Sequence, residues 1–375
     1  MLETNPKIMW PIAGKNLVNL SNSILKEMGS LPYSSTLVEL DKIFSQKNFK
    51  NIVLILYDGM GSCILDRFLP KTSFLQKNKI CDISSIFPAT TTAATTSILT
   101  GLEPSEHGWL GWDMYFKDDD ETVSIFKNTL KDSVSPAKQL TKNRPEMHYE
   151  NILDKINLQT PNDAYWAWPF DEKYPCCTLE EIESRICDLC HIPNKKFIYA
   201  YYHNPDKLMH ENGLNSPIVK EEMLNINFMT EKLYKSIPQN SLLIIVADHG
   251  HIACQYKTLS DYPPLYDMLA RTTAIETRAC AIKLKNNVDK KAFEHLFLQE
   301  FKNDFKLFSK NEVIQYNLFG KHIKNDIVTD NFADYIAVSI GHTCLRYDEK
   351  GNIFKTAHAG ISVDEMLVPL IIAEK

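Results

Sequence analysis

The stretch Ile52-Val53-Leu54-Ile55-Leu56-Tyr57-Asp58-Gly59 joins an unbroken apolar run to a carboxylate. A strand with one wet face alternates apolar and polar residues, whereas an uninterrupted run predicts a strand buried on both faces of a sheet. Residues 197–202, 242–247 and 367–373 have the same character, and helical patterns lie between such runs. The sequence therefore predicts an α/β fold, with a mostly parallel central sheet and helices on both of its faces.

Side chains able to hold metals lie just beyond these runs or close to the last of them. Three are carboxylates and three are imidazoles: Asp58, Asp206, His210, Asp248, His249 and His358. Open α/β sheets collect ligands at the carboxyl ends of their strands, and oxygen and nitrogen donors suit a pair of divalent cations. The pattern indicates an enzyme with a two-metal site. Each segment alone also fits an ordinary role, such as a turn at Asp58-Gly59.

A threonine-rich segment at residues 87–101 supplies a candidate nucleophile. Its small and apolar residues have helical spacing, and Gly101 is a suitable C-terminal stop, so we expect a helix that begins near Thr91. A hydroxyl at a helix start lies among unpaired N–H groups and the positive end of the helix dipole. Both features favour an alkoxide and a phosphoryl oxygen.

The order of these segments resembles the nucleotide pyrophosphatase/phosphodiesterase family of the alkaline phosphatase superfamily. Six segments carry the resemblance across most of the chain: Asp58-Gly59, Phe87-Pro88-Ala89-Thr90-Thr91, Thr100-Gly101-Leu102-Glu103-Pro104-Ser105-Glu106-His107-Gly108, Asp206 to His210, Asp248-His249-Gly250 and His358-Ala359-Gly360. The resemblance implies an alkaline phosphatase-like fold.

The resemblance also implies a role for each residue. One metal is held by Asp206, His210 and His358, and the other by Asp58, Asp248, His249 and Thr91. The family's ions are usually zinc, and manganese would accept the same ligands. Thr91, three residues after Pro88, becomes the nucleophile and forms a phosphothreonine intermediate. His203 and His251 are expected to orient ligands from behind.

Two departures from the family pattern concern the substrate. Trp112 stands where family diesterases commonly carry an asparagine that holds a phosphate oxygen, and Ala93-Ala94-Thr95 replaces the family's Pro-Asn-His. Trp112 has one indole N–H and a large ring, so we expect it to bind substrate as an apolar wall or stacking platform.

The function predicted is a metal-dependent hydrolase of phosphoric esters, a phosphodiesterase or nucleotide pyrophosphatase. Two alternatives stay open: a phosphomonoesterase or phosphonate hydrolase of the same superfamily, and a non-catalytic binding protein stabilised by its metals. A sulfatase is disfavoured, because the nucleophile segment lacks Cys or Ser followed by Pro and Arg.

Domain organisation follows from the scatter of the site residues over some 300 positions. We expect one catalytic domain, residues 1–260 and 344–375, and a small α+β insertion at residues 261–343. The insertion begins near Pro263-Pro264, and it would cap the site.

Composition limits the partners. A net charge of −6 and a pI near 6.0 argue against a nucleic acid polymer, although a small phosphate ester such as a nucleotide is acceptable beside metals. Nine cysteines without a regular framework favour free thiols in the cytoplasm. Residues 1–11 lack the apolar core of a signal sequence, and no apolar run is long enough to enter a membrane.

Three other patterns receive plainer interpretations. Cys187-Asp188-Leu189-Cys190-His191 matches a haem attachment motif, but Thr178 and Glu181 predict a capping box and an amphipathic helix there. Residues 118–121 form an acidic run expected in a solvated loop. Arg271 and Arg278 could reach a substrate phosphate, but surface pairing is favoured.

Overall fold

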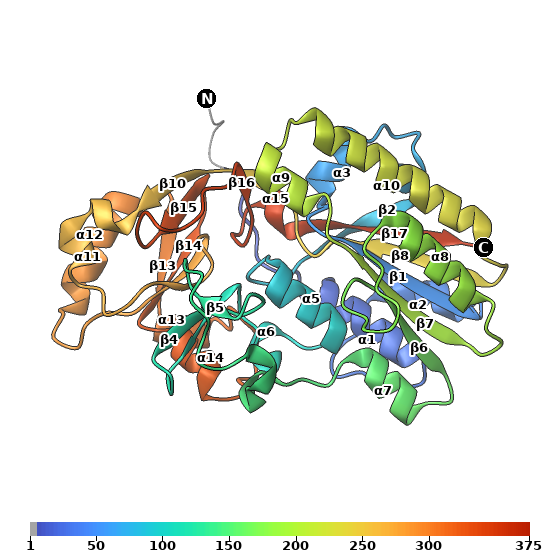
Figure 1. Ribbon diagram of the computed structural model, residues 1–375, viewed down its shortest axis with the longest axis horizontal. Coiled ribbons are helices and arrows are strands. Elements are labelled where there is room, and N and C mark those ends of the chain that lie inside the picture. The colour runs from blue at the N-terminus through green and yellow to red at the C-terminus, as the bar shows by residue number, and fades with distance from the viewer. Residues whose placement is uncertain (1–5) are drawn as a thin grey trace.

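The computed structural model describes residues 6–375, so the first five residues of the segment searched for a signal sequence lie outside it. A six-stranded sheet forms the centre of the larger half of the molecule (Figure 1), with the strand order β2-β17-β8-β1-β7-β6. Its strands are β1 (Asn51–Tyr57), β2 (Lys79–Ser84), β6 (Asp163–Ala167), β7 (Lys196–Tyr202), β8 (Ser241–Val246) and β17 (Leu367–Glu374). The four apolar runs singled out in the sequence are all strands of this sheet.

The sheet is mixed, which corrects the expectation of a mostly parallel one. Strands β6, β7, β1 and β8 run parallel to one another, but β17 is antiparallel to both β8 and β2. An apolar run predicts burial and does not record direction, because a strand covered on both faces has the same composition either way. The α/β class itself is confirmed.

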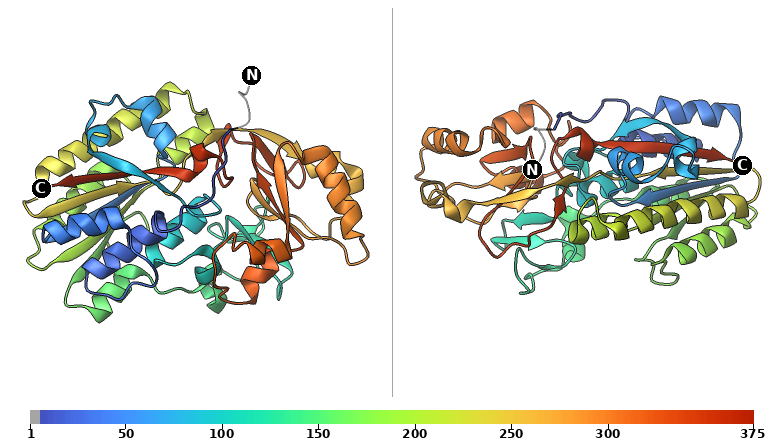
Figure 2. Two further views of the ribbon diagram at one scale, coloured as in Figure 1. Left: turned by 180° about the vertical axis from the view of Figure 1, so that it is seen from behind. Right: turned by 90° about the horizontal axis from the view of Figure 1, so that it is seen from above.

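Helices cover both faces of this sheet (Figures 1 and 2). One layer contains α1 (Leu17–Glu27), α2 (Val38–Gln46), α5 (Thr91–Thr100) and α7 (Ile152–Gln159). The other contains α3 (Ser62–Phe68), α4 (Phe74–Asn78), α8 (Leu179–Cys190), α9 (Asp206–Asn212) and α10 (Pro217–Ser236). The central strand β1 is buried along its whole length, as its sequence predicts.

The predicted amphipathic helix is α8. Thr178 caps it in a capping box with Glu181, and Ile182, Ile186 and Leu189 are buried. All nine cysteines are free, including Cys187 and Cys190. The haem-like motif is therefore the end of a packed helix.

A second, seven-stranded sheet has the order β13-β14-β12-β11-β3-β4-β5. It combines β3 (Asp113–Phe116), β4 (Glu121–Ser124) and β5 (Thr129–Leu130) with β11 (Ala274–Ile275), β12 (Ala279–Ile282), β13 (Phe305–Ser309) and β14 (Tyr335–Ser339). Short helices accompany it: α11 (Pro263–Tyr266), α12 (Lys290–Phe301), α13 (Lys310–Gln315) and α14 (Asp326–Asn331). Two segments far apart in sequence therefore share one sheet. The boundaries 261–343 remain a prediction.

Two-stranded pairings connect the halves. Strand β10 (Gln255–Thr258) pairs with β15 (Thr343–Arg346), and β9 (Ile252–Ala253) pairs with β16 (Thr356–Ala357). The short helices α6 (Pro104–His107) and α15 (Val363–Met366) complete the connections.

Arg278 lies in the interior, which corrects the expectation of surface pairing. Its guanidinium donates to both carboxylate oxygens of Glu365, at 2.6 and 2.8 Å, and both side chains are fully buried. Arg271 stacks its guanidinium on the ring of Tyr115, 3.3 Å from the centroid. In the acidic run, Asp119 pairs with Arg144 and Asp120 accepts a hydrogen bond from Tyr115.

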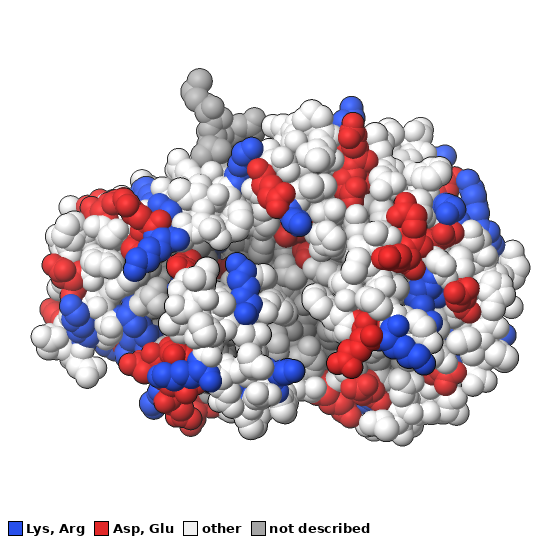
Figure 3. Space-filling view, viewed as in Figure 1, with Lys and Arg blue, Asp and Glu red and all other residues white. Residues whose placement is uncertain are grey.

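On the face shown in Figure 3, lysine and arginine are interspersed with aspartate and glutamate. Among the described residues, none of the helices combines the length and apolar character needed to cross a bilayer.

Candidate active site

Three neighbouring parallel strands bring the acidic residues together. Strands β8, β1 and β7 lie side by side, with Tyr57 opposite Tyr202 and Leu56 opposite Val246. Their carboxyl ends therefore reach one edge of the sheet at the same height. Asp58 follows β1 directly, Asp248 lies two residues beyond β8, and Asp206 begins α9 after β7.

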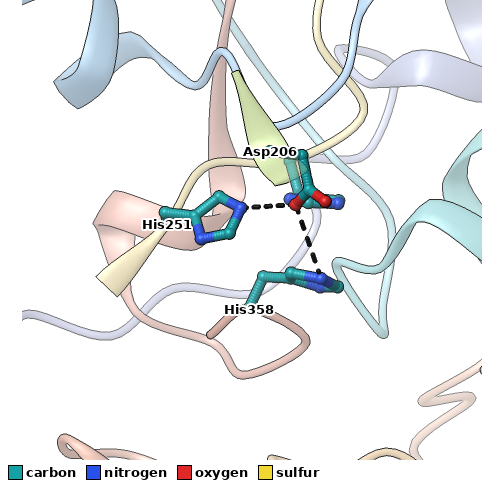
Figure 4. A group of neighbouring side chains, drawn as sticks. Asp206, His251 and His358 are labelled. Carbon is teal, nitrogen blue, oxygen red and sulfur yellow. Dashed lines mark hydrogen bonds and ion pairs between the residues drawn. The ribbon is translucent and has the colours of Figure 1, made fainter. Parts of the chain in front are cut away.

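The last histidine arrives through the β9–β16 pairing. Ala357 lies opposite Ile252 in this antiparallel pair, so the next residue, His358, lies beside His251. Figure 4 shows His251 and His358 converging on Asp206. His210, one helical turn after Asp206 on α9, completes this side of the cluster, with its Nε2 3.4 Å from Asp206 Oδ1.

Each histidine in the cluster presents the same nitrogen. The Nδ1 atoms of His210, His249 and His358 lie 2.8, 3.1 and 3.3 Å from the backbone carbonyls of Thr356, Gly250 and Ala89. An N–H that donates from Nδ1 leaves Nε2 with a free lone pair aimed at the centre. This is the tautomer that a metal-binding imidazole needs.

The spacing of these donor atoms suits a small divalent ion. His249 Nε2 lies 3.5 Å from both Asp58 Oδ1 and Asp248 Oδ2, and His358 Nε2 lies 3.8 Å from Asp206 Oδ1. A tetrahedral ion with bonds of about 2.0–2.1 Å holds its ligand atoms roughly 3.3–3.4 Å apart. Two groups bring their ligand atoms within 4.8 Å of one another, close enough to converge on an ion: Asp58, Asp248 and His249, and Asp206, His249, His251 and His358.

Electrostatics give an independent reason to expect cations here. Burial, together with the carboxylates of Asp248 and Asp206, raises the pKa of Asp58 well above its usual value. Asp248 Oδ2 is buried without a hydrogen-bond partner among the described residues. Because a buried carboxylate oxygen without a hydrogen bond is costly, this atom fits a metal ligand. Burial and His249 lower the pKa of His358, which keeps its imidazole neutral.

At the start of α5, the hydroxyl of Thr91 points in a different direction from those of Thr90 and Thr92. Its hydroxyl lies 3.1 Å from His249 Nε2 and 3.4 Å from Asp58 Oδ1. The Thr90 hydroxyl instead donates to Glu276 at 2.6 Å, and Thr92 is buried. Of the three adjacent threonines, Thr91 is the one that faces the cluster. The helix begins at Thr91 and ends at Gly101 in the left-handed conformation, as the sequence predicts.

Two glycines permit the close approaches that this site requires. A Cβ on Gly59, which has a φ of +72°, would lie 2.9 Å from Asp206 Cβ. A Cβ on Gly250 would lie 2.0 Å from the carbonyl oxygen of Asp364. Glycine is therefore needed in both Asp58-Gly59 and Asp248-His249-Gly250.

The structure also shows the contacts of three other residues that the sequence placed in or near the site: His251, His203 and Trp112. His251 Nε2 lies 2.5 Å from Asp206 Oδ1, and its Nδ1 lies 3.1 Å from the Thr356 hydroxyl. The ring of His203 packs against Tyr202. Trp112 lines the cavity next to Thr91, and its ring packs against Phe126.

The site opens into a cavity of about 490 Å³ that sequence analysis did not outline. Its walls combine cluster residues with Trp112, Lys131 and Glu276, which flank strands of the second sheet, and with Arg346 of β15 and Phe354 of the loop before His358. Tyr201, which donates to Asp58 Oδ2, was also missed. Neither Glu276 nor Tyr201 lies in a recognisable sequence motif. Only their neighbours in the folded chain show that they belong to the site.

Comparison with known proteins agrees with this geometry. The family model for type I phosphodiesterase/nucleotide pyrophosphatase matches residues 52–333. The chain belongs to this family. As a member of the family it is a hydrolase. A comparison with curated proteins gives no match.

Solved structures share the fold of this phosphodiesterase family member. Murine ectonucleotide pyrophosphatase/phosphodiesterase 5 is 17% identical with a TM-score of 0.66, over 86% of this chain and 88% of that one. An inactive threonine-to-alanine variant of the murine protein, in complex with AMP, gives 16% identity and a TM-score of 0.66, over 88% of each chain. The human counterpart gives 16% and 0.65, over 86% of this chain and 87% of that one.

Proposed function

We propose that this protein hydrolyses phosphodiesters or nucleotide pyrophosphates, with Thr91 as nucleophile and two divalent metals, preferably zinc. The observation that carries the proposal is the position of the Thr91 hydroxyl, within 3.4 Å of both His249 and Asp58 at one edge of the sheet. That the threonine-to-alanine variant of the murine structure is described as inactive supports the same role.

The start of α5 prepares the site for a phosphoryl group. Thr90 is the N-cap residue, but its side chain does not cap the helix. The N–H groups of the first turn lack that partner and can donate to a phosphoryl oxygen, which the helix dipole also favours. Thr91 then attacks phosphorus in line and gives up its hydroxyl proton, and the alcohol or phosphate leaves with a proton. Water hydrolyses the resulting phosphothreonine, which still carries the other ester group of the substrate, and releases a phosphate monoester.

Two groups of residues would hold the metals. Asp206, His210 and His358 form one set, with His251 in contact with Asp206. Asp58, Asp248, His249 and Thr91 form the other. When bound, the metals supply positive charge that stabilises the attacking and leaving oxygens. His249 and Asp58 orient the Thr91 hydroxyl, which is the nucleophile.

A pair of Thr91 variants tests the nucleophile. Thr91→Ala should lower turnover of bis(4-nitrophenyl) phosphate by roughly a thousandfold or more, because no hydroxyl remains to attack. Thr91→Ser is the matched control, since it keeps the hydroxyl and should keep measurable turnover. Acid-quenched protein analysed by mass spectrometry should carry a 4-nitrophenyl phosphoryl adduct at position 91 only where the hydroxyl is present.

Two results would overturn the proposal. Turnover that survives in Thr91→Ala would exclude this nucleophile. Faster hydrolysis of 4-nitrophenyl phosphate than of the diester by the unmodified protein would instead favour a phosphomonoesterase. Metal content, measured on the same samples, should stay near that of the unmodified protein in both variants.

A further inference from the structure

Glu276, like Asp113 and Asp132, is a carboxyl group of the cavity lining that has no role in the proposed mechanism. Glu276 reaches the cavity from the second sheet, one residue beyond β11, and shares its lining with Thr91 and Trp112. It lies far from the metal-ligand segments in sequence. A negatively charged side chain near a nucleophile that reacts with phosphate should weaken phosphate binding. Its contacts indicate what role it has.

Two donors from different elements hold the Glu276 carboxyl. The Thr90 hydroxyl donates to Oε1 at 2.6 Å, and the Trp112 backbone N–H donates to the same oxygen at 2.9 Å. Thr90 precedes the nucleophile, and Trp112 stands where the family pattern has a phosphate-holding asparagine. The carboxyl is thus fixed between the two places where a phosphoryl group is expected to bind.

The residue before Glu276 has a strained backbone conformation, and this conformation fixes the location of the Glu276 side chain. Ile275 has a φ of +71°, a conformation that is costly for a β-branched residue. Gly111 packs so closely on it that a Cβ there would lie 2.7 Å from Ile275 Cγ2. Strained backbone persists only where the surroundings enforce it, and it gathers at functional sites.

The charge around Glu276 is only partly balanced. Burial, with a smaller contribution from Asp113, raises the pKa of Glu276 to about 7, although its hydrogen bonds and Lys131 oppose the rise. At pH 8.5 the group is therefore ionised. A phosphate monoester carries two negative charges at that pH, because its second pKa is near 6, whereas a diester carries one.

We propose that Glu276 is a specificity-determining residue that excludes doubly charged phosphoryl groups and so restricts the site to diesters. This inference rests on the proposed function. Like charges placed close together in a partly buried site repel, and each added charge on the ligand increases the penalty. Glu276 thereby selects for diesters without having to contact the metals.

Glu276→Gln tests the inference, because it removes the charge and keeps the shape and the Oε1 acceptor. At pH 8.5, the ratio of kcat/KM for bis(4-nitrophenyl) phosphate to that for 4-nitrophenyl phosphate should fall about tenfold, through faster monoester hydrolysis. Glu300→Gln, at an exposed site on α12, is the matched control and should leave the ratio unchanged. An unchanged ratio in Glu276→Gln, or an equal loss on both substrates, would overturn the proposal.

A binding measurement separates this inference from the proposed function. In the Thr91→Ala background, calorimetry with inorganic phosphate and with dimethyl phosphate reports charge preference without turnover. Adding Glu276→Gln should strengthen phosphate binding about tenfold and leave dimethyl phosphate binding nearly unchanged. If the unmodified protein hydrolyses neither ester, the proposed function fails, and this comparison still decides the role of Glu276. Equal effects on both ligands would refute it.

Discussion

The two sheets contribute to one cavity in different ways. The six-stranded sheet supplies Asp58, Asp206 and Asp248 from the ends of adjacent parallel strands, where register fixes their separation. The seven-stranded sheet supplies Trp112 and Glu276 from the region where β3 meets β11, which is held by a strained isoleucine and a closely packed glycine. The first arrangement follows from regular secondary structure, and the second depends on irregular local packing.

This contrast suggests a division of labour. Groups that must hold metals within a few tenths of an ångström are placed on the most regular part of the fold, because rigid elements fix distances best. Groups that distinguish one substrate from another come from short strands and turns, where a few substitutions can change the direction of a side chain. We expect changes in the first sheet to abolish turnover and changes in the second to alter substrate preference.

Removing a carboxylate from the six-stranded sheet should have the largest effect. Asp248→Asn removes a buried negative charge at a carboxylate whose Oδ2 has no hydrogen-bond partner among the described residues. We expect bound metal to fall and diester turnover to drop roughly a thousandfold, because charge stabilisation in the transition state is lost. Elemental analysis and steady-state kinetics measure the two effects.

The same substitution at an exposed carboxylate controls for the loss of one charge. Asp188→Asn on α8 should leave both metal content and turnover near those of the unmodified protein. Full metal content and turnover in Asp248→Asn would show that the strand ends do not form the metal site.

The buried ion pair between the sheets should give the next largest effect. Arg278 follows the Glu276 turn and pairs with Glu365, which also accepts the N–H of Gly360 beside His358. Arg278→Met would leave a buried carboxylate unpaired and should lower the free energy of unfolding by about 3–5 kcal/mol. Urea denaturation of the metal-free protein measures this change.

A double variant distinguishes the pair from simple packing. Arg278→Met with Glu365→Leu removes both charges and should recover most of the stability. Arg271→Met, which removes a guanidinium stacked on Tyr115, should cost only about 1 kcal/mol. A single Arg278 variant no less stable than Arg271→Met would contradict the expected coupling between the sheets.

The regular half of this comparison was accessible from sequence. Apolar runs predicted β1, β7 and β8, and the residues following them in the chain predicted the carboxylates of the cluster. The helix starting at Thr91 and ending at Gly101 followed from capping rules. Each of these features is specified by residues that are close together in the sequence, so the sequence alone is sufficient to predict it.

The irregular half was not accessible in the same way. The direction of β17 depends on the path of the chain between β16 and the sheet, which composition does not record. Arg278 was assigned to the surface because its partner Glu365 lies 87 positions away. Glu276 gave no signal, since its meaning depends on Thr90 and Trp112, which are far away in sequence and adjacent only in the folded chain.

A smaller effect is expected from acid at the junction of the two halves. His107, on α6, lies 3.0 Å from the Ser97 hydroxyl through Nε2 and accepts the Trp109 N–H at Nδ1. Burial, helped by Lys324, lowers its pKa to about 3. Below pH 6.5 the unfolded chain binds a proton that the folded chain does not. Stability is therefore fully present above pH 6.5 and falls as the pH drops, by about 1.4 kcal/mol per unit.

A comparison of variants isolates this contribution. The difference in unfolding free energy between the unmodified protein and His107→Asn should shrink by about 2 kcal/mol between pH 6.5 and 5. His295→Asn, at an exposed position on α12, should follow the unmodified curve. Parallel curves for His107→Asn and the unmodified protein would mean that this imidazole does not stay neutral when folded.

The smallest effect is expected at the aromatic wall of the cavity. Trp112→Phe keeps the backbone N–H that holds Glu276 and shortens only the ring that lines the cavity. Stacking contributes about 0.5–1.5 kcal/mol, so KM for a nucleoside 4-nitrophenyl phosphate should rise about threefold to tenfold while kcat stays within about twofold. Trp166→Phe, whose ring stacks on Trp168 away from this cavity, is the control. A lowered kcat in Trp112→Phe would place the ring in the chemical step and remove the proposed separation between the two sheets.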